Sequence, residues 1–402
     1  MADSTTTAIE RKAGPPAAKV APWNDPKVRG FFFQVVLLVA LLWFCWWLFA
    51  NTTANLERQK IASGFDFLNT TAGFGIIQTP IEYSETSTYG RAFLVGLINT
   101  LIVAAIGCVL ATILGFVIGV ARLSHNWLVS RLAAVYIEIF RNLPLLLQIF
   151  FWYFVVLRLL PHPRDSLKPF ENFYINVRGV FTPNPVPEDG FWLIVVAFVA
   201  AIVGIVTIKR WATKRQEATG QTFPVFWTSI GLLVVLPFIA AAVMGFPMGW
   251  EYPKATRFSI SGGFIIYPEL AAMTLALSVY TASFIAEIVR AGIMAVSHGQ
   301  TEAAHSLGLR NGPTLRLVVI PQAMRVIIPP LTSQYLNLTK NSSLSAAIAY
   351  PELVSVFAGT VLNQTGQAIE VIGITMLVYA TISLSISAGM NVYNKKMALV
   401  ER

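Results

Sequence analysis

The stretch Gly299-Gln-Thr-Glu-Ala-Ala-His-Ser-Leu-Gly308, followed after nine residues by Val318-Val-Ile-Pro321, is a polar segment between two long apolar runs. The residue types from Gln300 to Leu307 predict about two helical turns, and Gly308 suits the left-handed position that ends a helix. Asn311-Gly312-Pro313 then predicts a turn, with Pro313 in the first turn of the next helix. We therefore expect a short helix at a membrane surface, followed by a chain that re-enters the membrane.

This short helix has the composition of a docking element. Ala303 and Ala304 have small side chains, so another protein can approach the backbone closely, and Glu302 adds one negative charge. The alternative is an ordinary interfacial helix that contacts only lipid headgroups.

The composition of the chain indicates a membrane protein. Of its 402 residues, 55% are hydrophobic and only 12% are charged, and the mean hydropathy is +0.63. These values lie outside the range of ordinary soluble domains. A helix needs about 20 apolar residues to cross a bilayer, and eight runs meet that length. They lie at 31–50, 92–121, 133–160, 191–208, 223–245, 264–290, 326–349 and 369–391.

The basic residues predict the orientation of these spans. With the amino terminus placed in the cytoplasm, 18 of the 29 Lys and Arg residues fall on the inner side and nine on the outer side, and Arg141 and Lys340 lie within spans. The positive-inside rule favours this arrangement, with both termini inside. The net charge of +9 then reflects topology, and no nucleic-acid partner is expected.

Four segments resemble the permease subunits of ABC importers for polar amino acids. In the EAA loop of that family, Glu-Ala-Ala is followed after three residues by Gly and after nine more by Ile-x-Leu-Pro. Glu302, Ala303, Ala304, Gly308 and Pro321 fall in register, and Val318 and Ile320 replace the Ile and the Leu. The other three segments are Tyr136 to Tyr153, Ala286 to Ile293 and Leu338 to Leu344. Over its whole length, the chain looks like one membrane subunit of a general L-amino acid ABC importer, in the histidine, glutamate, glutamine and arginine permease family.

The resemblance implies an all-α integral membrane fold of about eight transmembrane helices, with a five-helix type I importer core. The expected parts, in chain order, are a cytoplasmic tail (1–30), an extra transmembrane helix (31–50), a periplasmic loop (51–90), the first part of the core (91–160), a periplasmic loop with an inserted helical pair (161–263), the second part of the core (264–395) with its cytoplasmic coupling loop (292–325), and a cytoplasmic end (396–402).

The resemblance also implies the partners. They are a cytosolic ABC ATPase dimer, a second permease subunit, a periplasmic amino-acid-binding protein and the lipid of a bacterial inner membrane. The second permease is expected to be a paralogue, and an identical copy is the alternative that stays open. The residues expected to couple to the ATPase are Gly299, Glu302, Ala303, Ala304, Gly308 and Pro321.

Polar residues in the run 326–349 predict a substrate pathway. On one continuous helix, Ser333, Gln334, Asn337, Lys340, Asn341 and Ser345 fall within about 140° of one face. Such a face is normally turned toward a cavity or a partner helix, and Lys340 can attract a carboxylate. Two alternatives stay open: these groups bond to neighbouring helices, or Lys340 pairs with an acidic residue.

Two charged pairs are expected to stabilise the local fold and not to bind substrate. Glu138 and Arg141 share a spacing of three residues, as do Glu287 and Arg290, so each pair can form a local ion pair. Gly115-Phe-Val-Ile-Gly119 has the spacing of a close helix contact. Cys45, Cys108 and the four histidines lack ligand spacing, so we expect neither a disulfide nor a metal site.

The sequence predicts a transport subunit and not an enzyme. It contains no Gly-Lys dipeptide, so it has no phosphate-binding Gly-x-x-x-x-Gly-Lys-Ser/Thr loop, and no catalytic residue or cofactor is expected. ATP and Mg²⁺ would be bound by the partner ATPase. The alternative function is an ion-gradient-driven secondary amino acid transporter, and a channel is a third class; neither has a reason to carry the stretch from Gly299 to Pro321.

Overall fold

The structure is a computed structural model that describes residues 26–59, 63–256 and 259–397. Most of the predicted cytoplasmic tail and the last five residues therefore lie outside the described residues. The residues up to Gly64 and those from Phe65 onward form two separate compact units. In the first unit, helix α1 (Pro26–Gln59) contains the predicted span 31–50 and continues beyond it at both ends. Residues 51–59 are thus helical, where a loop was predicted. Ala54, Leu56, Glu57, Arg58 and Gln59 are good helix formers, and the Thr53 hydroxyl donates to the carbonyl oxygens of Phe49 and Ala50 in the preceding turn.

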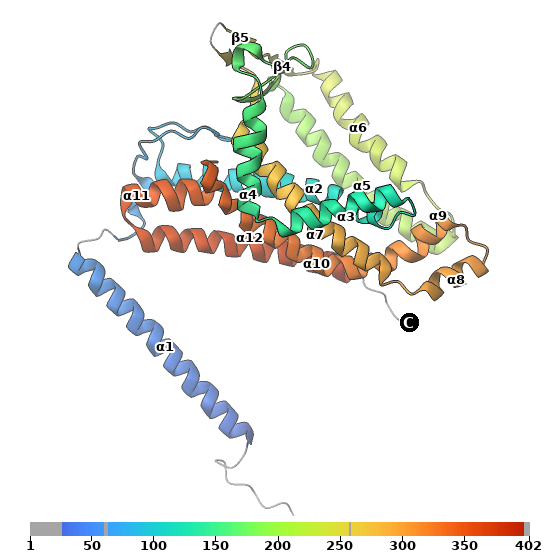
Figure 1. The fold of residues 1–402 in the computed structure, drawn as a ribbon, viewed down its shortest axis with the longest axis horizontal. Helices are drawn as coiled ribbons and strands as arrows, with labels where there is room; N and C mark the ends of the chain where they lie inside the picture. The colour runs from blue at the N-terminus through green and yellow to red at the C-terminus, as the bar shows by residue number, and fades with distance from the viewer. Residues whose placement is uncertain (1–25, 60–62, 257–258, 398–402) are drawn as a thin grey trace, which may run out of the picture. The chain divides into compact units, whose positions relative to one another are not determined.

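The second unit consists mainly of helices (Figure 1). Its long helices are α2 (Tyr89–Arg122), α3 (Trp127–Asn142), α5 (Phe191–Thr219), α6 (Val225–Val243), α7 (Pro268–Met294), α10 (Ile320–Asn341) and α12 (Ala368–Met397), and its short ones are α4 (Leu145–Phe150), α8 (His298–Ser306), α9 (Asn311–Thr314) and α11 (Leu362–Thr365). Among the described residues of the whole chain, seven helices are long and apolar enough to cross a membrane, or eight if the bent pair α3 and α4 is one span. The prediction of about eight spans is confirmed.

The predicted span 133–160 is not one straight helix. The helical segments Trp127–Asn142 and Leu145–Leu159 meet at an angle of 106°. Pro144 causes the break, because the residue before a proline is driven out of the helical region; Leu143 accordingly has an extended backbone with φ −87° and ψ 130°. After the bend, α4 continues as a π-helical turn, Phe151–Val156, and a 3-10 turn, Leu157–Leu159.

The core of the second unit is built around α7. Ala272, Met273, Ala276, Leu277 and Ala282 on this helix are fully buried. The helix α2 packs against it through the two glycines of the predicted contact motif. A β-carbon on Gly115 would lie 2.6 Å from the side chain of Ile285, and one on Gly119 would lie 2.7 Å from the carbonyl oxygen of Ala286. The predicted close contact at these glycines is confirmed.

Helices α5 and α6 lie side by side (Figure 1). A β-carbon on Gly204 of α5 would contact the Leu232 side chain of α6 at 3.2 Å. Of the residues in the two helices, only Ala201, Ala212 and Ala240 are buried. The rest of both helices remains available to lipid or to another subunit. That this pair is an insertion into a five-helix core stays a prediction.

The segments on either side of this pair form short strands that the sequence analysis did not predict. Strands β1 (Tyr174–Asn176), β2 (Gly179–Thr182) and β7 (Phe264–Ile266) make one antiparallel sheet. Strands β3 (Asn184–Pro187) and β4 (Met248–Glu251) pair with each other, as do β5 (Lys254–Ala255) and β6 (Ile260–Ser261). The β2–β7 and β3–β4 pairings join the chain before α5 to the chain after α6, so the helical pair starts and ends at the same place.

A buried polar network attaches the 65–88 segment to the rest of the second unit. The Asn99 side-chain amide of α2 donates to the carbonyl oxygens of Gln78, at 3.0 Å, and Pro351, at 2.9 Å. The Tyr350 hydroxyl donates to the Asn99 carbonyl oxygen at 3.2 Å. Buried polar groups of this kind are stabilising only when they are hydrogen-bonded, so these bonds fix where the segment lies.

Next to this network, Glu352 is a fully buried carboxylate. It accepts hydrogen bonds from the amides of Val354 and Ser355, at 2.8 and 2.7 Å, and from the Tyr379 hydroxyl at 3.0 Å. It lies between the spans that end at Ile348 and begin at Ala368. Burial raises the pKa of the Glu352 carboxyl above its ordinary value, although these hydrogen bonds oppose the shift.

Candidate functional site

The stretch that was predicted to dock against a partner forms a helix of the expected length. Helix α8 covers His298–Ser306, and Gly308 has the predicted left-handed conformation with φ +78°. The Gly308 amide donates to the carbonyl oxygen of His305 at 2.9 Å, and the Leu309 amide donates to that of Ala304 at 3.1 Å. This pair of bonds is the Schellman motif, which ends a helix at a left-handed glycine. The end of α8 is therefore fixed by backbone geometry.

The exposed face of α8 differs from the predicted one at Ala304. Gly299, Glu302 and Ala303 are exposed, whereas Ala304 is only 4% exposed. The backbone carbonyl of Ala304 accepts the hydrogen bond from the Leu309 amide in the turn that follows. Ala303 thus presents its small side chain at the surface of this chain and Ala304 does not, and the coupling role of both alanines stays a prediction.

Glu302 presents its charge at the surface of α8. Its Oε1 lies 3.0 Å from Nδ1 of His298, one helical turn earlier, and both side chains are largely exposed. The carbonyl oxygen of Glu302 accepts a hydrogen bond from the Ser306 hydroxyl at 2.9 Å. An exposed pair of this kind contributes only about 0–1 kcal/mol to stability, so the carboxylate can be shared with a partner at small cost.

Pro321 lies just after a distortion in the returning helix. The residues Leu315–Val319 form a π-helical turn between α9 and α10, and Pro321 is the second residue of α10. A proline in a continuing helix removes one backbone hydrogen bond and displaces the preceding turn, and a π-helical turn can accommodate this change. Pro321 therefore shapes the return of the chain and, being only half-buried, does not form the exposed face.

The two ends of the loop are held together by close packing. Gly292 near the end of α7 faces Ile327 of α10, and a β-carbon at this glycine would overlap that side chain. The Gln322 side-chain amide donates to the Gln300 side-chain oxygen at 3.2 Å and so links the starts of α10 and α8. These contacts give α8 a defined place relative to the two long helices.

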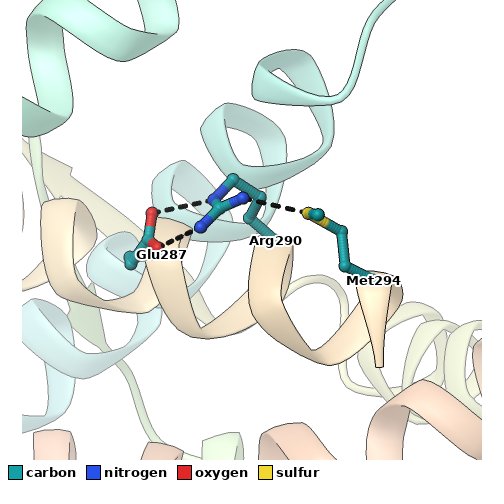
Figure 2. Close-up of polar contacts among 3 residues, drawn as sticks. All are labelled: Glu287, Arg290 and Met294. Atoms are coloured by element: carbon teal, nitrogen blue, oxygen red, sulfur yellow. Dashed lines mark hydrogen bonds and ion pairs between the residues drawn. The ribbon is translucent and has the colours of Figure 1, made fainter. Parts of the chain in front are cut away.

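The predicted ion pair at the end of α7 is confirmed. The Arg290 guanidinium contacts both carboxylate oxygens of Glu287, at 2.6 and 3.0 Å, and its third nitrogen lies 2.9 Å from the Met294 sulfur (Figure 2). All three residues lie on one face of the last two turns of α7. The guanidinium thereby holds the helix end from which the loop starts.

The other predicted ion pair does not form. Among the described residues, Glu138 makes no ion pair, and the Asn142 side-chain amide donates to its backbone carbonyl oxygen at 2.7 Å and to its carboxylate at 3.4 Å. Arg141 instead lies 5.3 Å from the centre of the Phe284 ring on α7, which is the geometry of a cation–π contact. Both charged groups are exposed on α3, where an ion pair would be weak.

The polar residues of the predicted pathway lie on α10 only as far as Asn341. Asn337 and Lys340 are exposed, and Gln334 and Asn341 are half-buried. Within the described part of the chain, the side chains of these four residues have no hydrogen-bond or ion-pair partner. The two local alternatives for Lys340, a neighbouring helix or an acidic residue of this chain, therefore find no support in these contacts. The role of these four polar residues in substrate passage stays a prediction.

Ser345 departs from this face. The α-helix ends at Asn341 and continues as a 3-10 turn, Ser342–Ile348, so the 100° spacing no longer applies. Ser345 is fully buried, and its hydroxyl has no partner among the described residues. The expected α-helical face therefore ends at Asn341, and a role of Ser345 in substrate passage stays a prediction.

Two residues with structural roles near these sites were not singled out from the sequence. Gly292 sets the distance between α7 and α10, and it lies within the segment Ala286 to Ile293 that carries part of the family resemblance. Glu352 is an acidic residue in the apolar stretch Tyr350-Pro-Glu-Leu353. An ionisable group in such a stretch is a signal that could have identified it.

Comparisons with known proteins agree with this arrangement. Residues 194–398 match the family described as binding-protein-dependent transport system inner membrane component. The chain is 55% identical over 378 residues to YhdX of Escherichia coli (strain K12), which is assigned as an amino-acid ABC transporter permease; the match covers 94% of this chain and 96% of YhdX. It is 53% identical over 378 residues to the general L-amino acid transport system permease protein AapQ of Rhizobium johnstonii, covering 94% of each chain. It is also 43% identical to the glutamate/glutamine/aspartate/asparagine transport system permease protein BztB of Rhodobacter capsulatus, covering 94% of this chain and 96% of BztB. The chain therefore belongs to the binding-protein-dependent transport system inner membrane components and is a multi-pass permease subunit of the amino acid ABC transporter type.

Proposed function

We propose that this subunit carries L-amino acids inward across a bacterial inner membrane and that a separate ATPase dimer drives it through the loop 292–325. The observation that supports the coupling role is the exposed α8, where Glu302 and Ala303 face outward on a helix whose end is fixed by Gly308. An exposed helix can transmit the closing of an ATPase dimer to the membrane helices, because Gln300 of α8 is hydrogen-bonded to Gln322 of α10, and α10 packs closely against α7 at Gly292.

The proposal assigns the other components as follows. The ATPase binds ATP and Mg²⁺, and this chain contributes no catalytic residue. A paralogous permease completes the membrane unit and covers the polar face of α10 that carries Gln334, Asn337, Lys340 and Asn341. A periplasmic amino-acid-binding protein delivers substrate to the outer segments. The names of the relatives AapQ and BztB support amino acids as the transported class.

Transport by reconstituted vesicles tests the energy source. Vesicles that contain this chain, its paralogue, the ATPase and the binding protein should accumulate labelled L-amino acids only with ATP. Vanadate should abolish this uptake, and an uncoupler should leave it unchanged. A secondary transporter driven by an ion gradient would give the opposite pattern. Uptake that persists without the ATPase subunits would overturn the proposal.

A further inference from the structure

A second polar feature of the molecule is a cavity of about 560 Å³ at the start of α7. It lies where the helical run after α4 ends, and the turn between β1 and β2, the 65–88 segment and the start of α7 all contribute to its lining. Tyr153, Arg158, Arg178, Tyr267 and Glu269 are among the residues that line it. Arg158 and Arg178 fall on the outer side in the topology that the basic residues predict. The cavity is therefore at the outer end of the core and far along the chain from the loop 292–325.

The charged groups of the cavity are not paired with one another. The Glu269 carboxylate accepts a hydrogen bond from the Tyr153 hydroxyl at 2.8 Å, and it makes no ion pair within the described residues. Arg178 donates to the Ser259 hydroxyl at 3.1 Å, which uses one of its five donors. Arg158 makes no hydrogen bond or ion pair within the same part of the chain. Two guanidinium groups and one carboxylate thus share one cavity without neutralising each other.

The backbone that carries Tyr153 and Arg158 is irregular at this point. The π-helical turn Phe151–Val156 contains Tyr153, and the 3-10 turn Leu157–Leu159 contains Arg158. Short π-helical turns occur frequently at functional sites. The carboxylate comes from the first turn of α7, where Glu269 follows Pro268. The three ionic side chains therefore come from three separate segments that converge on the same space.

We propose that this cavity is an outer binding site for a free amino acid, which rests on the proposed transport function. The guanidinium groups of Arg158 and Arg178 hold the carboxylate of the ligand, because guanidinium binds carboxylates in a bidentate geometry. Glu269, positioned by Tyr153, holds the ammonium group. The half-buried Tyr267 lines an apolar wall for the side chain. Because two cations face one anion, amino acids with a second carboxylate bind more tightly than neutral ones, and basic amino acids bind least.

Direct binding to the complete transporter, in nanodiscs without nucleotide or binding protein, tests this site. The probes are L-glutamate and 2-oxoglutarate, which has the same two carboxylates and no ammonium group. The wild type should bind L-glutamate more tightly than 2-oxoglutarate. Glu269→Gln should weaken L-glutamate binding by about tenfold and remove most of this preference, since hydrogen bonds to a charged group contribute at that level. Arg158→Gln and Arg178→Gln should weaken both probes by about threefold or more, as these guanidinium groups are exposed.

Conservative variants separate binding from folding. Glu269→Asp, Arg158→Lys and Arg178→Lys keep the charges and should restore part of the lost affinity. Arg164→Gln is the matched control, because Arg164 is in the same outer region and does not line the cavity. If Glu269→Gln keeps the full preference for L-glutamate in an assembled complex, or if the wild type binds neither probe, the site is wrong. This outcome is distinct from failure of the proposed function, in which vesicles with the wild type show no ATP-driven uptake.

Discussion

Gly292 of α7 lies against Ile327 of α10, so closely that a β-carbon at this glycine would overlap the isoleucine side chain. The contact joins the two long helices that carry the coupling loop. A residue with no side chain is required here, since any larger one separates the helices.

We expect Gly292→Val to lower stability by about 1–3 kcal/mol, which is the usual effect of overpacking a filled site. The thermal midpoint of the purified subunit in detergent measures this effect. Gly389→Val is the matched control, because Gly389 is also within a helix, α12, and an added β-carbon there would meet no atom within 4 Å. Equal losses in both variants would show that helix propensity, and not the contact with Ile327, sets the effect.

Gly308→Val tests the turn that ends α8. A left-handed backbone costs an L-residue with a β-carbon roughly 1–2 kcal/mol, and an added β-carbon at Gly308 would have no neighbour within 4 Å. The variant should therefore change the path of the loop without a steric clash. We expect the ATPase to co-purify less well, while the permease still reaches the membrane.

Two variants control for Gly308→Val. Gly308→Asn should retain most of the binding, because asparagine tolerates the left-handed conformation, and Gly312→Val should have a smaller effect, since Gly312 does not have a positive φ. Full ATPase binding and full uptake in Gly308→Val would contradict the coupling role of the loop.

The features predicted correctly from the sequence depend on local chemistry. The left-handed Gly308, the helix before it and the Glu287–Arg290 pair each follow from residues within one or two turns of one another. The membrane spans were also predicted from local sequence, because each span corresponds to one long apolar run. The Gly115 and Gly119 contact was predicted from spacing, although its partner, α7, became known only from the structure.

The features predicted wrongly depend on distant parts of the chain or on small backbone changes. The burial of Ala304 was not predicted, and Arg141 contacts Phe284 of another helix instead of Glu138 on its own. Ser345 does not continue the polar face of α10, because the α-helix ends at Asn341 and the chain continues as a 3-10 turn. Strands β2 and β7 pair with each other although α5 and α6 lie between them in the sequence. A local residue pattern does not predict pairing between segments that are so far apart.

Labelling in intact cells tests the topology that the basic residues predict. In a background without Cys45 and Cys108, a single cysteine at Val186 should react with an impermeant thiol reagent added outside. A single cysteine at His305 should react only after the membrane is permeabilised. Both positions are exposed in the structure, so a difference between them reports the side of the membrane. Labelling of position 305 from outside would overturn the orientation.

Glu352→Gln should change how stability depends on pH. The folded-state pKa of Glu352 is raised by burial, so the folded state binds this proton more tightly than the unfolded state does. Its contribution is therefore most favourable below the ordinary carboxyl pKa, and it is lost as the pH rises through the raised value. We expect the thermal midpoint of the wild type to fall relative to Glu352→Gln over that range and then to level off. A constant difference between the two proteins from pH 4 to pH 8 would contradict this assignment.

Lys340→Met tests the polar face of α10. Methionine keeps the length of the side chain and removes its charge. An ammonium group in a partly desolvated path attracts a carboxylate by more than the roughly 0–1 kcal/mol of an exposed pair, because the local dielectric constant is lower. Uptake should therefore fall by about fivefold or more, while assembly with the ATPase and the second permease is retained. Lys209→Met, which removes an exposed lysine from α5, should leave uptake unchanged. An assembled Lys340→Met complex with normal uptake would remove Lys340 from the pathway. Loss of assembly would instead show that Lys340 contacts another subunit, because this chain provides no acidic partner for Lys340 among its described residues.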